Sequence, residues 1–176
     1  LESDRPMSTG KFTESDLENG ALLPFFTQST EHGGLGWMQG TDSMVDKARC
    51  VVREDLLLFL KTGTPGNTDA FQEAMKIKRH KDEFAFIEDF CEQTLDPLLK
   101  SEINAAYILQ KNVMYAGQTF TLYNAAPSAG DVKTQCSAFA LNALRVIPQV
   151  RYRCGAFVRI PDLMMFVNGL YFGYCE

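Results

Sequence analysis

The sequence contains no long apolar run. The longest candidates are DLLLFL at 55–60 and PDLMMFVNGLYFGY at 161–174, and both are too short or too interrupted for the ~20 apolar residues that a membrane-spanning helix requires. No secretory signal peptide is recognisable. We therefore expect no transmembrane segment, although peripheral association with a membrane complex remains compatible with the sequence.

Positive charge is also scarce. The 176 residues carry a formal net charge of −5, which argues against general nucleic-acid binding because such binding needs a positive field. The charges are unevenly distributed: residues 1–46 hold eight acidic and two basic side chains, whereas residues 132–176 hold five basic and two acidic ones. The two ends either complement each other within the molecule or meet oppositely charged partners.

The sequence has few histidines and no cysteine or histidine spacing typical of a metal site. The chain has two histidines, no CxxC pair and no His–Cys spacing suited to zinc. His80 lies in the charged stretch KIKRHKDE and is expected to be solvated, and no serine or cysteine is tied to His32 by a motif. The carboxylates between 82 and 92 are expected to form a solvated face. We predict no catalytic residue, metal or cofactor, and an enzyme that uses His32 with a cysteine is a minor alternative.

The five cysteines give little information about the cellular compartment. Cys50, Cys91 and Cys136 fall in helical patterns and are expected to be buried and reduced. Pairing of Cys154 with Cys175 is left open. Because the chain begins with Leu1, we expect a processed form or a fragment. A processed form would fit an organellar lumen or secretion.

Glycine is concentrated in QSTEHGGLGWMQGTDS, residues 28–43, which also holds the single tryptophan. The spacing GxGxxxG is one residue longer than the dinucleotide fingerprint, and no strand precedes it, so nucleotide binding is not expected. The glycines instead give a flexible strap that carries Trp37 with Leu35 and Met38. Such an aromatic is either a lid over the protein's own core or an anchor on another protein.

Apolar residues recur at three- and four-residue steps in the middle of the chain, which predicts four amphipathic helices. They are expected at about 43–61, 68–95, 97–116 and 129–147. The predicted fold is mainly α, an antiparallel four-helix bundle with an extended N-terminal arm and an irregular apolar C-terminal segment.

Three regions follow from this pattern. Residues 1–41 form the arm, residues 42–148 the bundle, and residues 149–176 a segment that packs on the bundle or on a partner. In the last region QVRYR alternates like a strand, while PDLMMFV is expected to be a short helix that begins at Pro161. In layout only, an arm leading into a four-helix bundle resembles the extrinsic lumenal subunits of photosystem II.

The leading functional hypothesis is a non-enzymatic structural or docking subunit whose partners are other protein subunits, contacted by the arm and the aromatic and arginine-rich C-terminal segment. The resemblance in layout implies, as an alternative, an extrinsic subunit of a photosynthetic membrane complex. A further alternative is a secreted effector or a protein that binds a small apolar ligand near Phe59, Phe84, Tyr107 and Phe139. The residues predicted to contact a partner are Phe25, Phe26, Leu35, Trp37, Met38, Arg151, Arg153, Arg159, Tyr171, Phe172 and Tyr174.

Overall fold

The computed structural model describes residues 13–101, 105–128, 130, 133–154 and 156–176, and its fold is mixed α/β rather than a four-helix bundle. The helical segments are α1 (Glu14–Leu17), η1 (Glu18–Leu22), α2 (Leu23–Thr27), η2 (Thr30–His32), η3 (Asp42–Met44), α3 (Arg53–Thr62), α4 (Pro65–Lys78), α5 (Glu83–Phe90), η4 (Cys91–Leu95), α6 (Asp96–Lys100), α7 (Ala105–Leu109) and α8 (Lys133–Phe139). The strands are β1 (Met38–Gln39), β2 (Val45–Asp46), β3 (Val51–Val52), β4 (Asn112–Tyr115), β5 (Gln118–Thr121), β6 (Leu144–Pro148), β7 (Tyr152–Cys154), β8 (Phe157–Arg159), β9 (Leu163–Val167) and β10 (Leu170–Cys175).

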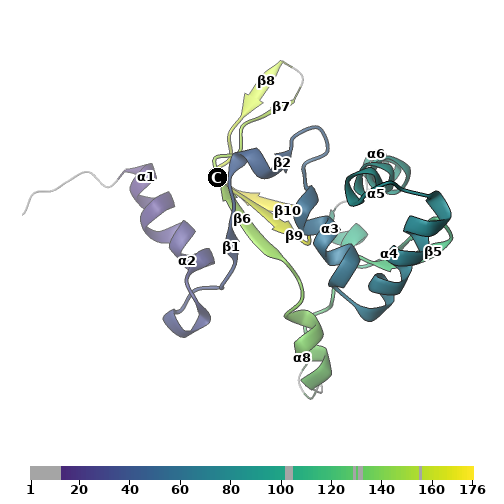
Figure 1. Cartoon of the computed structure of the whole chain (residues 1–176). Helices are drawn as coiled ribbons and strands as arrows, with labels where there is room; N and C mark the ends of the chain where they lie inside the picture. Colours follow the sequence, from purple (N-terminus) through teal and green to yellow (C-terminus); the bar gives the residue numbers. More distant parts are fainter. Residues whose placement is uncertain (1–12, 102–104, 129, 131–132, 155) are drawn as a thin grey trace, which may run out of the picture.

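A curled six-stranded sheet forms the centre of the molecule, with the strand order β1-β6-β9-β10-β3-β2 (Figure 1). Strand β1 pairs parallel with β6, and the other neighbours are antiparallel. Asn168 and Gly169 join β9 to β10 with φ of 51° and 80°, the left-handed backbone that tight hairpin turns require. A side chain at position 169 would also lie 2.2 Å from the Val52 carbonyl oxygen.

Two of the expected helices are shorter than predicted and are followed by strands, because their apolar spacing fits either structure. The predicted helix over 97–116 ends early, and β4 and β5 form a hairpin whose turn residues Ala116 and Gly117 both have positive φ. The predicted helix over 129–147 contains only α8 before β6 begins. PDLMMFV is strand β9, in which four of five residues are buried. A central strand buried on both faces loses the polar alternation that would identify it.

The expected extended arm is also wrong over its described part. Residues 14–27 are continuously helical through α1, η1 and α2. This N-terminal helix lies on one side of the sheet in Figure 1, where Phe26 packs with Val146 and Leu163. Trp37 borders this cluster, 5.4 Å from the Phe26 ring in an edge-to-face arrangement. The end of this segment therefore packs on the sheet, with Phe26 in the core.

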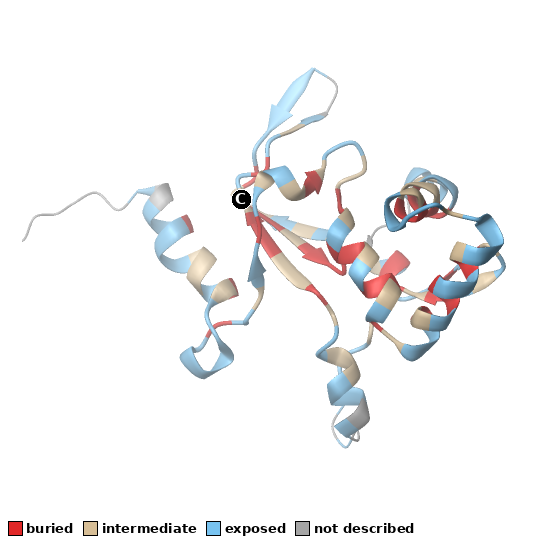
Figure 2. Ribbon diagram, viewed as in Figure 1, coloured by how far each residue is buried: buried red, intermediate tan, exposed pale blue. Residues whose placement is uncertain are grey.

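Helices α3 to α6 and the β4–β5 hairpin pack on the opposite side of the sheet and enclose the largest apolar cluster (Figure 2). The rings of Phe86, Phe90, Tyr115 and Phe120 pack against one another at its centre, with centroid separations of 5.4 to 6.5 Å. Val51 and Leu170 connect this cluster to the sheet.

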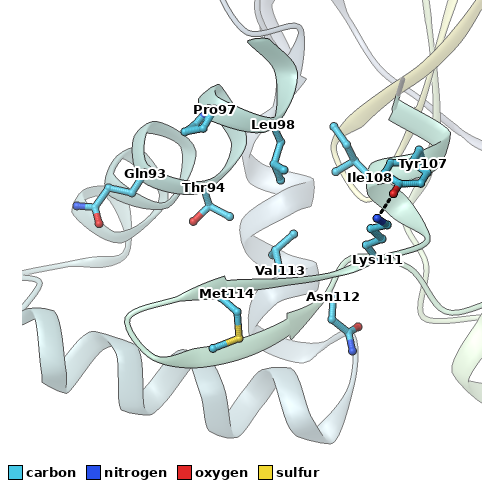
Figure 3. Close-up of a pocket in the computed structure, with 10 residues that line it drawn as sticks. All are labelled: Gln93, Thr94, Pro97, Leu98, Tyr107, Ile108, Lys111, Asn112, Val113 and Met114. Atoms are coloured by element: carbon cyan, nitrogen blue, oxygen red, sulfur yellow. Dashed lines mark hydrogen bonds between the residues drawn. The ribbon is translucent and has the colours of Figure 1, made fainter. Parts of the chain in front are cut away.

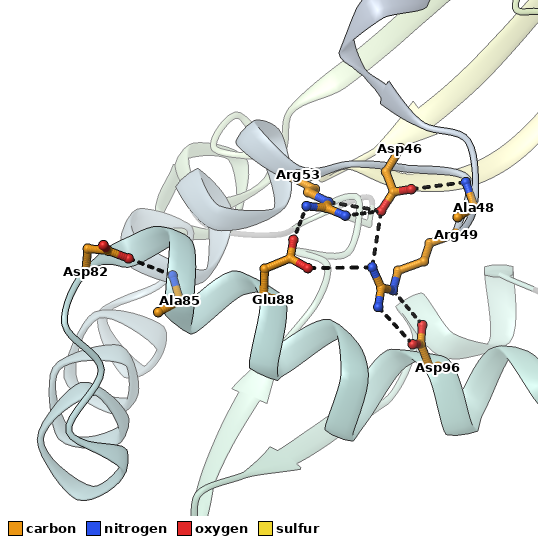
Figure 4. Close-up of polar contacts among 8 residues, drawn as sticks. All are labelled: Asp46, Ala48, Arg49, Arg53, Asp82, Ala85, Glu88 and Asp96. Atoms are coloured by element: carbon orange, nitrogen blue, oxygen red, sulfur yellow. Dashed lines mark hydrogen bonds and ion pairs between the residues drawn. The ribbon is translucent and has the colours of Figure 1, made fainter.

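A cluster of charged side chains, which we call the paired cluster, joins the turn before α3 to the helices α5 and α6 (Figure 4). Arg49 donates two hydrogen bonds to Asp96, at 2.9 and 3.1 Å, and Arg53 donates to Asp46 at 3.0 and 2.5 Å. Arg53 also contacts Glu88. Each carboxylate of the cluster therefore faces a guanidinium group.

The fold corrects two further expectations. The resemblance in layout to extrinsic photosystem II subunits depended on a four-helix bundle, so it no longer supports an assignment. Cys91 is buried as expected, but Cys50 is half-buried and Cys136 is exposed. Cys175 is a free thiol, and the Cys154 side chain lies outside the described part. No helix among the described residues is long and apolar enough to cross a membrane.

Candidate functional site

A polar cavity of about 340 Å³ lies where the N-terminal helix meets the end of the central sheet. We call it the sheet-end cavity. It differs from the other cavities described below, because two carboxylates contribute to its wall. Its lining residues are Glu18, Asn19, Leu23, Pro148, Gln149, Asp162 and Leu163.

The strand register explains how these distant residues meet. Pro148 on β6 pairs with Leu163 on β9, and Leu163 pairs with Cys175 on β10. The next residue along each strand is Gln149, Asp162 and Glu176, respectively. The Gln149 N–H donates to the Asp162 carbonyl at 2.9 Å, which continues the β6–β9 ladder by one step. The β9–β10 ladder ends at the pair Leu163–Cys175, and Glu176 does not line the cavity.

Glu18 enters the cavity from the helical side. It lies in η1 and is only 9% exposed. Its Oε2 accepts a hydrogen bond of 3.0 Å from Gln149 Nε2. No described residue donates to its other oxygen, Oε1. Glu18 therefore keeps acceptor capacity in the cavity although the residue is nine-tenths buried.

Asp162 supplies the second carboxylate, which is half-buried. Within the described residues this carboxylate has neither an ion pair nor a hydrogen-bond donor. The described residues that line the cavity also include no lysine, arginine or histidine. No buried side-chain nitrogen or oxygen among the described residues lacks a hydrogen-bond partner, so the carboxylate oxygens that accept no hydrogen bond in this cavity are open to solution, where a cation can reach them.

The donor set suits a hard divalent cation. No group of three or more His, Cys, Asp or Glu side chains placed to hold a metal occurs among the described residues, so an all-protein cage of the zinc or calcium type is not supported. Mg²⁺ needs less, because it keeps several waters and binds through one or two carboxylates together with substrate phosphates. Two carboxylates, those of Glu18 and Asp162, line this cavity.

A basic hairpin leaves the sheet at this same end. Strands β7 and β8 are inserted between Gln149 and Asp162, and in Figure 1 they rise from the end of the sheet where the C-terminus is marked. The segment 149–161 contains three arginines and no acidic residue. Arg151, Arg153 and Arg159 are all exposed, and within the described part of the chain none of their side chains has an ion pair. The hairpin is therefore a positive projection next to a negative cavity.

The predicted contact residues on the N-terminal segment are divided between core and surface. Phe26 is buried and Trp37 half-buried, whereas Phe25, Leu35 and Met38 are 42 to 50% exposed. Trp37 covers the apolar cluster that contains Phe26 in its own domain. Whether these residues also contact a partner stays a prediction.

Three of the predicted contact residues meet in an apolar cavity of about 450 Å³, which we call the apolar cavity. Leu35 and Trp37 line it together with Phe172, which is 49% exposed. Of the other predicted residues in the C-terminal segment, Tyr171 packs on the sheet with its ring 6.2 Å from that of Phe166, and Tyr174 is 53% exposed.

The ligand pocket expected near Phe59, Phe84, Tyr107 and Phe139 does not form as one space. Phe59 is buried and Phe84 is 65% exposed. Phe139 lines the apolar cavity, whereas Tyr107 lines a separate cavity of about 370 Å³ between η4, α7 and β4 (Figure 3). There Lys111 contacts the Tyr107 hydroxyl and lies 3.9 Å from its ring centroid. Lys111 and Tyr107 therefore form a cation–π pair in the wall of this cavity.

The histidines and cysteines form no nucleophilic pair in the described region. His32 accepts from or donates to Ser29 Oγ at 2.8 Å, and His80 is 2.6 Å from the Tyr115 hydroxyl. Burial raises the pKa of the Cys50 thiol to about 11 and that of Cys91 to about 12. Both thiols are therefore protonated near neutral pH, which does not favour cysteine nucleophiles.

Sequence reasoning missed the sheet-end cavity. Glu18 is one of the acidic residues of the predicted arm, Asp162 lies in the helix predicted to begin at Pro161, and Gln149 and Glu176 have no predicted role. The signal was present in the two polar ends of the apolar run IPDLMMFVNGLYFGYCE. Reading that run as a hairpin around Asn168-Gly169 would have placed Asp162 at the end of the sheet.

Comparisons with protein-family models, with curated proteins and with solved structures returned no match.

Proposed function

We propose that this protein is a divalent-cation-dependent phosphodiesterase that acts on nucleic acid at the sheet-end cavity. The observation that carries the proposal is the juxtaposition of two carboxylates without a protein cation, Glu18 and Asp162, and an arginine-rich hairpin. The first feature calls for a metal ion, and the second for an anionic substrate. This proposal departs from the expectation of a non-enzymatic subunit.

The cation has a defined role in this reaction. Bound by Glu18 and Asp162, it would neutralise the phosphate charge and lower the pKa of an attacking water. Hydrolysis adds that water to phosphorus and breaks one P–O ester bond, which leaves a phosphate end and a hydroxyl end.

Nucleic acid is the phosphodiester that best fits the hairpin. One arginine guanidinium group can donate two parallel hydrogen bonds to a phosphate. A two-stranded ribbon can enter a nucleic-acid groove. Phe157, 73% exposed on β8, offers an aromatic face beside Arg159. The net charge of −5 disfavours a wholly basic surface. A substrate bound beside the hairpin, however, is exposed to the local electrostatic field of segment 149–161.

The direct test is a cleavage assay on fluorescently labelled single- and double-stranded DNA and RNA, with Mg²⁺ or Mn²⁺ and with EDTA. We expect cleavage that depends on the cation, and a fall of about 10²-fold or more in Asp162→Asn, because a carboxylate that would bind the metal directly is lost. Asp69→Asn is the matched control, because Asp69 is an exposed carboxylate on α4. Cation-independent turnover, or equal activity of both variants, would remove the proposal.

A second candidate, the docking subunit, is favoured by the apolar cavity. Leu35, Trp37 and Phe172 converge there from segments far apart in the chain, and aromatic side chains in an open apolar pocket are typical of contact hot spots. This candidate requires no catalysis, and both roles are compatible in one chain.

The docking role is tested by comparing two exposed apolar positions. Phe172→Ser should abolish capture of a specific protein partner, while Leu58→Ser, at a side chain 55% exposed on α3, should leave it intact. Both variants should keep their thermal midpoint within a few degrees, because neither side chain is buried. Equal capture by the two variants would argue against the apolar cavity as the contact.

A further inference from the structure

We infer that one face of the β7–β8 hairpin, together with a tyrosine-lined cavity at its base, binds the unstacked bases of a single-stranded nucleic acid; this inference rests on the nucleic-acid substrate of the proposed function. In this arrangement the exposed arginines of the hairpin bind phosphates, and aromatic rings bind the bases.

The register of the hairpin places aromatic and basic side chains on a common face. Tyr152 pairs with Arg159, and residues that lie directly opposite each other in an antiparallel pair share a face. Phe157 lies two residues before Arg159 on the same strand, so its side chain points to that face as well. Phe157 is 73% exposed, and Arg159 is exposed without an ion pair among the described residues. This face, which we call the aromatic face, therefore presents a ring and a guanidinium group to solvent.

A cavity of about 210 Å³ lies at the base of the hairpin and is lined by three tyrosines, Tyr152, Tyr171 and Tyr174. We call it the tyrosine cavity. Tyr152 belongs both to this cavity and to the aromatic face, so the two surfaces are continuous. Lys47 also lines the cavity, and no described residue in its wall is acidic. The tyrosine cavity therefore has aromatic walls and no negative charge that would repel a phosphate.

A β-bulge brings two of these tyrosines together. Tyr171 pairs with Phe166 on β9, Tyr174 pairs with Met164, and the register shifts between the two tyrosines. Residues 164 and 166 share a face of β9, so Tyr171 and Tyr174 share that face although they are three residues apart. In a regular strand this spacing would send them to opposite faces. The extra residue, Phe172, lines the apolar cavity instead, and re-aiming of a side chain in this way is typical of bulges.

The tyrosine cavity and the sheet-end cavity are lined by adjacent residues. Val150 and Pro161 line the tyrosine cavity, and their neighbours in the chain, Gln149 and Asp162, line the sheet-end cavity. A strand bound along the aromatic face would therefore lie at the end of the sheet where hydrolysis is proposed.

These side chains fit bases whose faces are open. Aromatic rings stack on the face of an unpaired base, whereas a base in a duplex already stacks on its neighbours. Proteins that read a duplex groove use side chains that hydrogen-bond to base edges. Apart from arginine, such side chains are absent from VRYRCGAFVRI, residues 150–160. A single strand is therefore the form of nucleic acid that this surface favours.

An anionic membrane is the other polyanion that arginines and exposed apolar side chains could meet. Arg153 pairs with Val158, the residue next to Phe157, so it lies only about 3.3 Å from the level of Phe157 along the ribbon. An interfacial segment buries its apolar side by about 5–10 Å, which would carry this arginine in with the ring. The hairpin therefore fits nucleic acid better than a lipid surface.

The test measures binding by fluorescence anisotropy to labelled single-stranded DNA, single-stranded RNA and duplex DNA, in EDTA so that cation-dependent cleavage does not interfere. We expect the wild type to bind its preferred single strand at least about 10-fold more tightly than the duplex. Phe157→Leu and Tyr174→Leu remove a ring and keep an apolar side chain, and each should weaken binding of that strand about 10-fold. Phe157→Tyr and Tyr174→Phe, which keep a ring, should bind like the wild type.

Phe84→Leu is the matched control, because Phe84 is an aromatic residue on α5 with 65% of its surface exposed. It should leave the affinity unchanged. Phe157 and Tyr174 are 73% and 53% exposed, so their variants should also keep the melting temperature of the wild type. Equal binding of single strands and duplex by the wild type, or an equal loss in Phe84→Leu and Phe157→Leu, would overturn the inference.

A strand with the same phosphates but without bases separates stacking from charge. It should bind the wild type and Phe157→Leu with equal, weak affinity. Abasic and ordinary strands that bind the wild type equally well would overturn the inference, because the arginines alone would then account for binding.

Vesicles of phosphatidylcholine and phosphatidylserine provide the membrane arm of the test. Vesicle binding that depends on Phe157, with no binding of single strands, would overturn the inference in favour of a membrane. A preference for single strands without cation-dependent cleavage would remove the proposed activity and leave the binding surface in place. Cleavage together with equal binding of single strands and duplex would have the opposite meaning, so the two failures are distinguishable.

Discussion

The paired cluster and the sheet-end cavity contain the same acidic residue types in opposite circumstances. In the paired cluster, Asp46 and Asp96 accept hydrogen bonds from Arg53 and Arg49 at 2.5 to 3.1 Å. In the sheet-end cavity, the nearest donor to Glu18 is the neutral amide of Gln149. The first region joins two parts of the fold, whereas the second has negative charge without a protein partner.

This difference distinguishes carboxylates that stabilise the fold from carboxylates that are available to a ligand. A carboxylate that faces a guanidinium group contributes to the fold and has no capacity left for a ligand. A carboxylate without such a partner keeps its charge and its acceptor capacity for a ligand. The contrast predicts that substitutions in the two kinds of region have opposite effects on stability.

The largest effect on stability is expected at Asp55, which resembles the paired cluster in being fully matched. Its carboxylate accepts from Arg145 at 2.6 and 2.8 Å, with the two side chains 6% and 12% exposed. Asp55→Asn leaves the guanidinium without its counter-charge, and we expect a loss of about 3–5 kcal/mol in the free energy of unfolding. Urea denaturation measures it, with Asp69→Asn as the exposed control. A loss below that of the control would contradict the contrast.

The opposite behaviour is expected in the sheet-end cavity. Without metal, Asp162→Asn should be as stable as the wild type or more stable, because it removes an unpaired charge. Mn²⁺ should stabilise the wild type by about 2.7 kcal/mol at a concentration 100 times its dissociation constant, and should stabilise Asp162→Asn much less. Thermal denaturation over a range of Mn²⁺ concentrations measures both. Equal stabilisation of the two proteins would place the cation elsewhere.

A smaller effect is expected from acid in the paired cluster. Burial by itself would raise the pKa of the Asp46 carboxyl, but the hydrogen bond and charge of Arg53 hold it below its ordinary value of 3.8. The lowered pKa means that this stabilisation is complete above pH ~3.8 and is lost as the pH falls through the folded-state value. Denaturation curves from pH 6 down to pH 3 should show the decline. Asp46→Asn should be less stable throughout and should decline less.

Much of the local structure follows from the sequence, while the site does not. The stretches around α3 and α5 carry the expected apolar stripe. The helix predicted over 68–95 is instead two helices, α4 and α5, capped by Thr64 and Asp82, and the helix predicted from 43 begins only at Arg53. The fold class failed because neither strand shows polar alternation: β9 is almost wholly buried, and β6 contains a single polar residue, Arg145. Glu18, Gln149 and Asp162 become neighbours only through sheet register and helix docking, which local periodicity does not encode.

The net charge of the chain, like its local periodicity, does not show which charged groups become neighbours in the fold. The expectation of no nucleic-acid partner used the net charge of the whole chain, −5, and no observation yet tests it. The average includes carboxylates that are already matched, such as Asp46, Asp55 and Asp96. Matched carboxylates contribute little to the field around the β7–β8 hairpin, so the local arginines are what a polyanion would encounter.

The smallest predicted effect tests that local field. Arg153 lies on β7, is exposed, and has no ion pair among the described residues. If it contacts a phosphate, Arg153→Ala should weaken DNA binding and reduce the slope of log K against log salt by about 1. Fluorescence anisotropy in Ca²⁺, between 50 and 300 mM salt, measures the slope. Lys100→Ala, at an exposed cation on α6, should leave it unchanged, because a cation outside the hairpin releases no counterions from the bound strand. If both substitutions lower the slope equally, the hairpin has no special role in DNA binding. The contrast between the paired cluster and the sheet-end cavity would then be limited to cation binding.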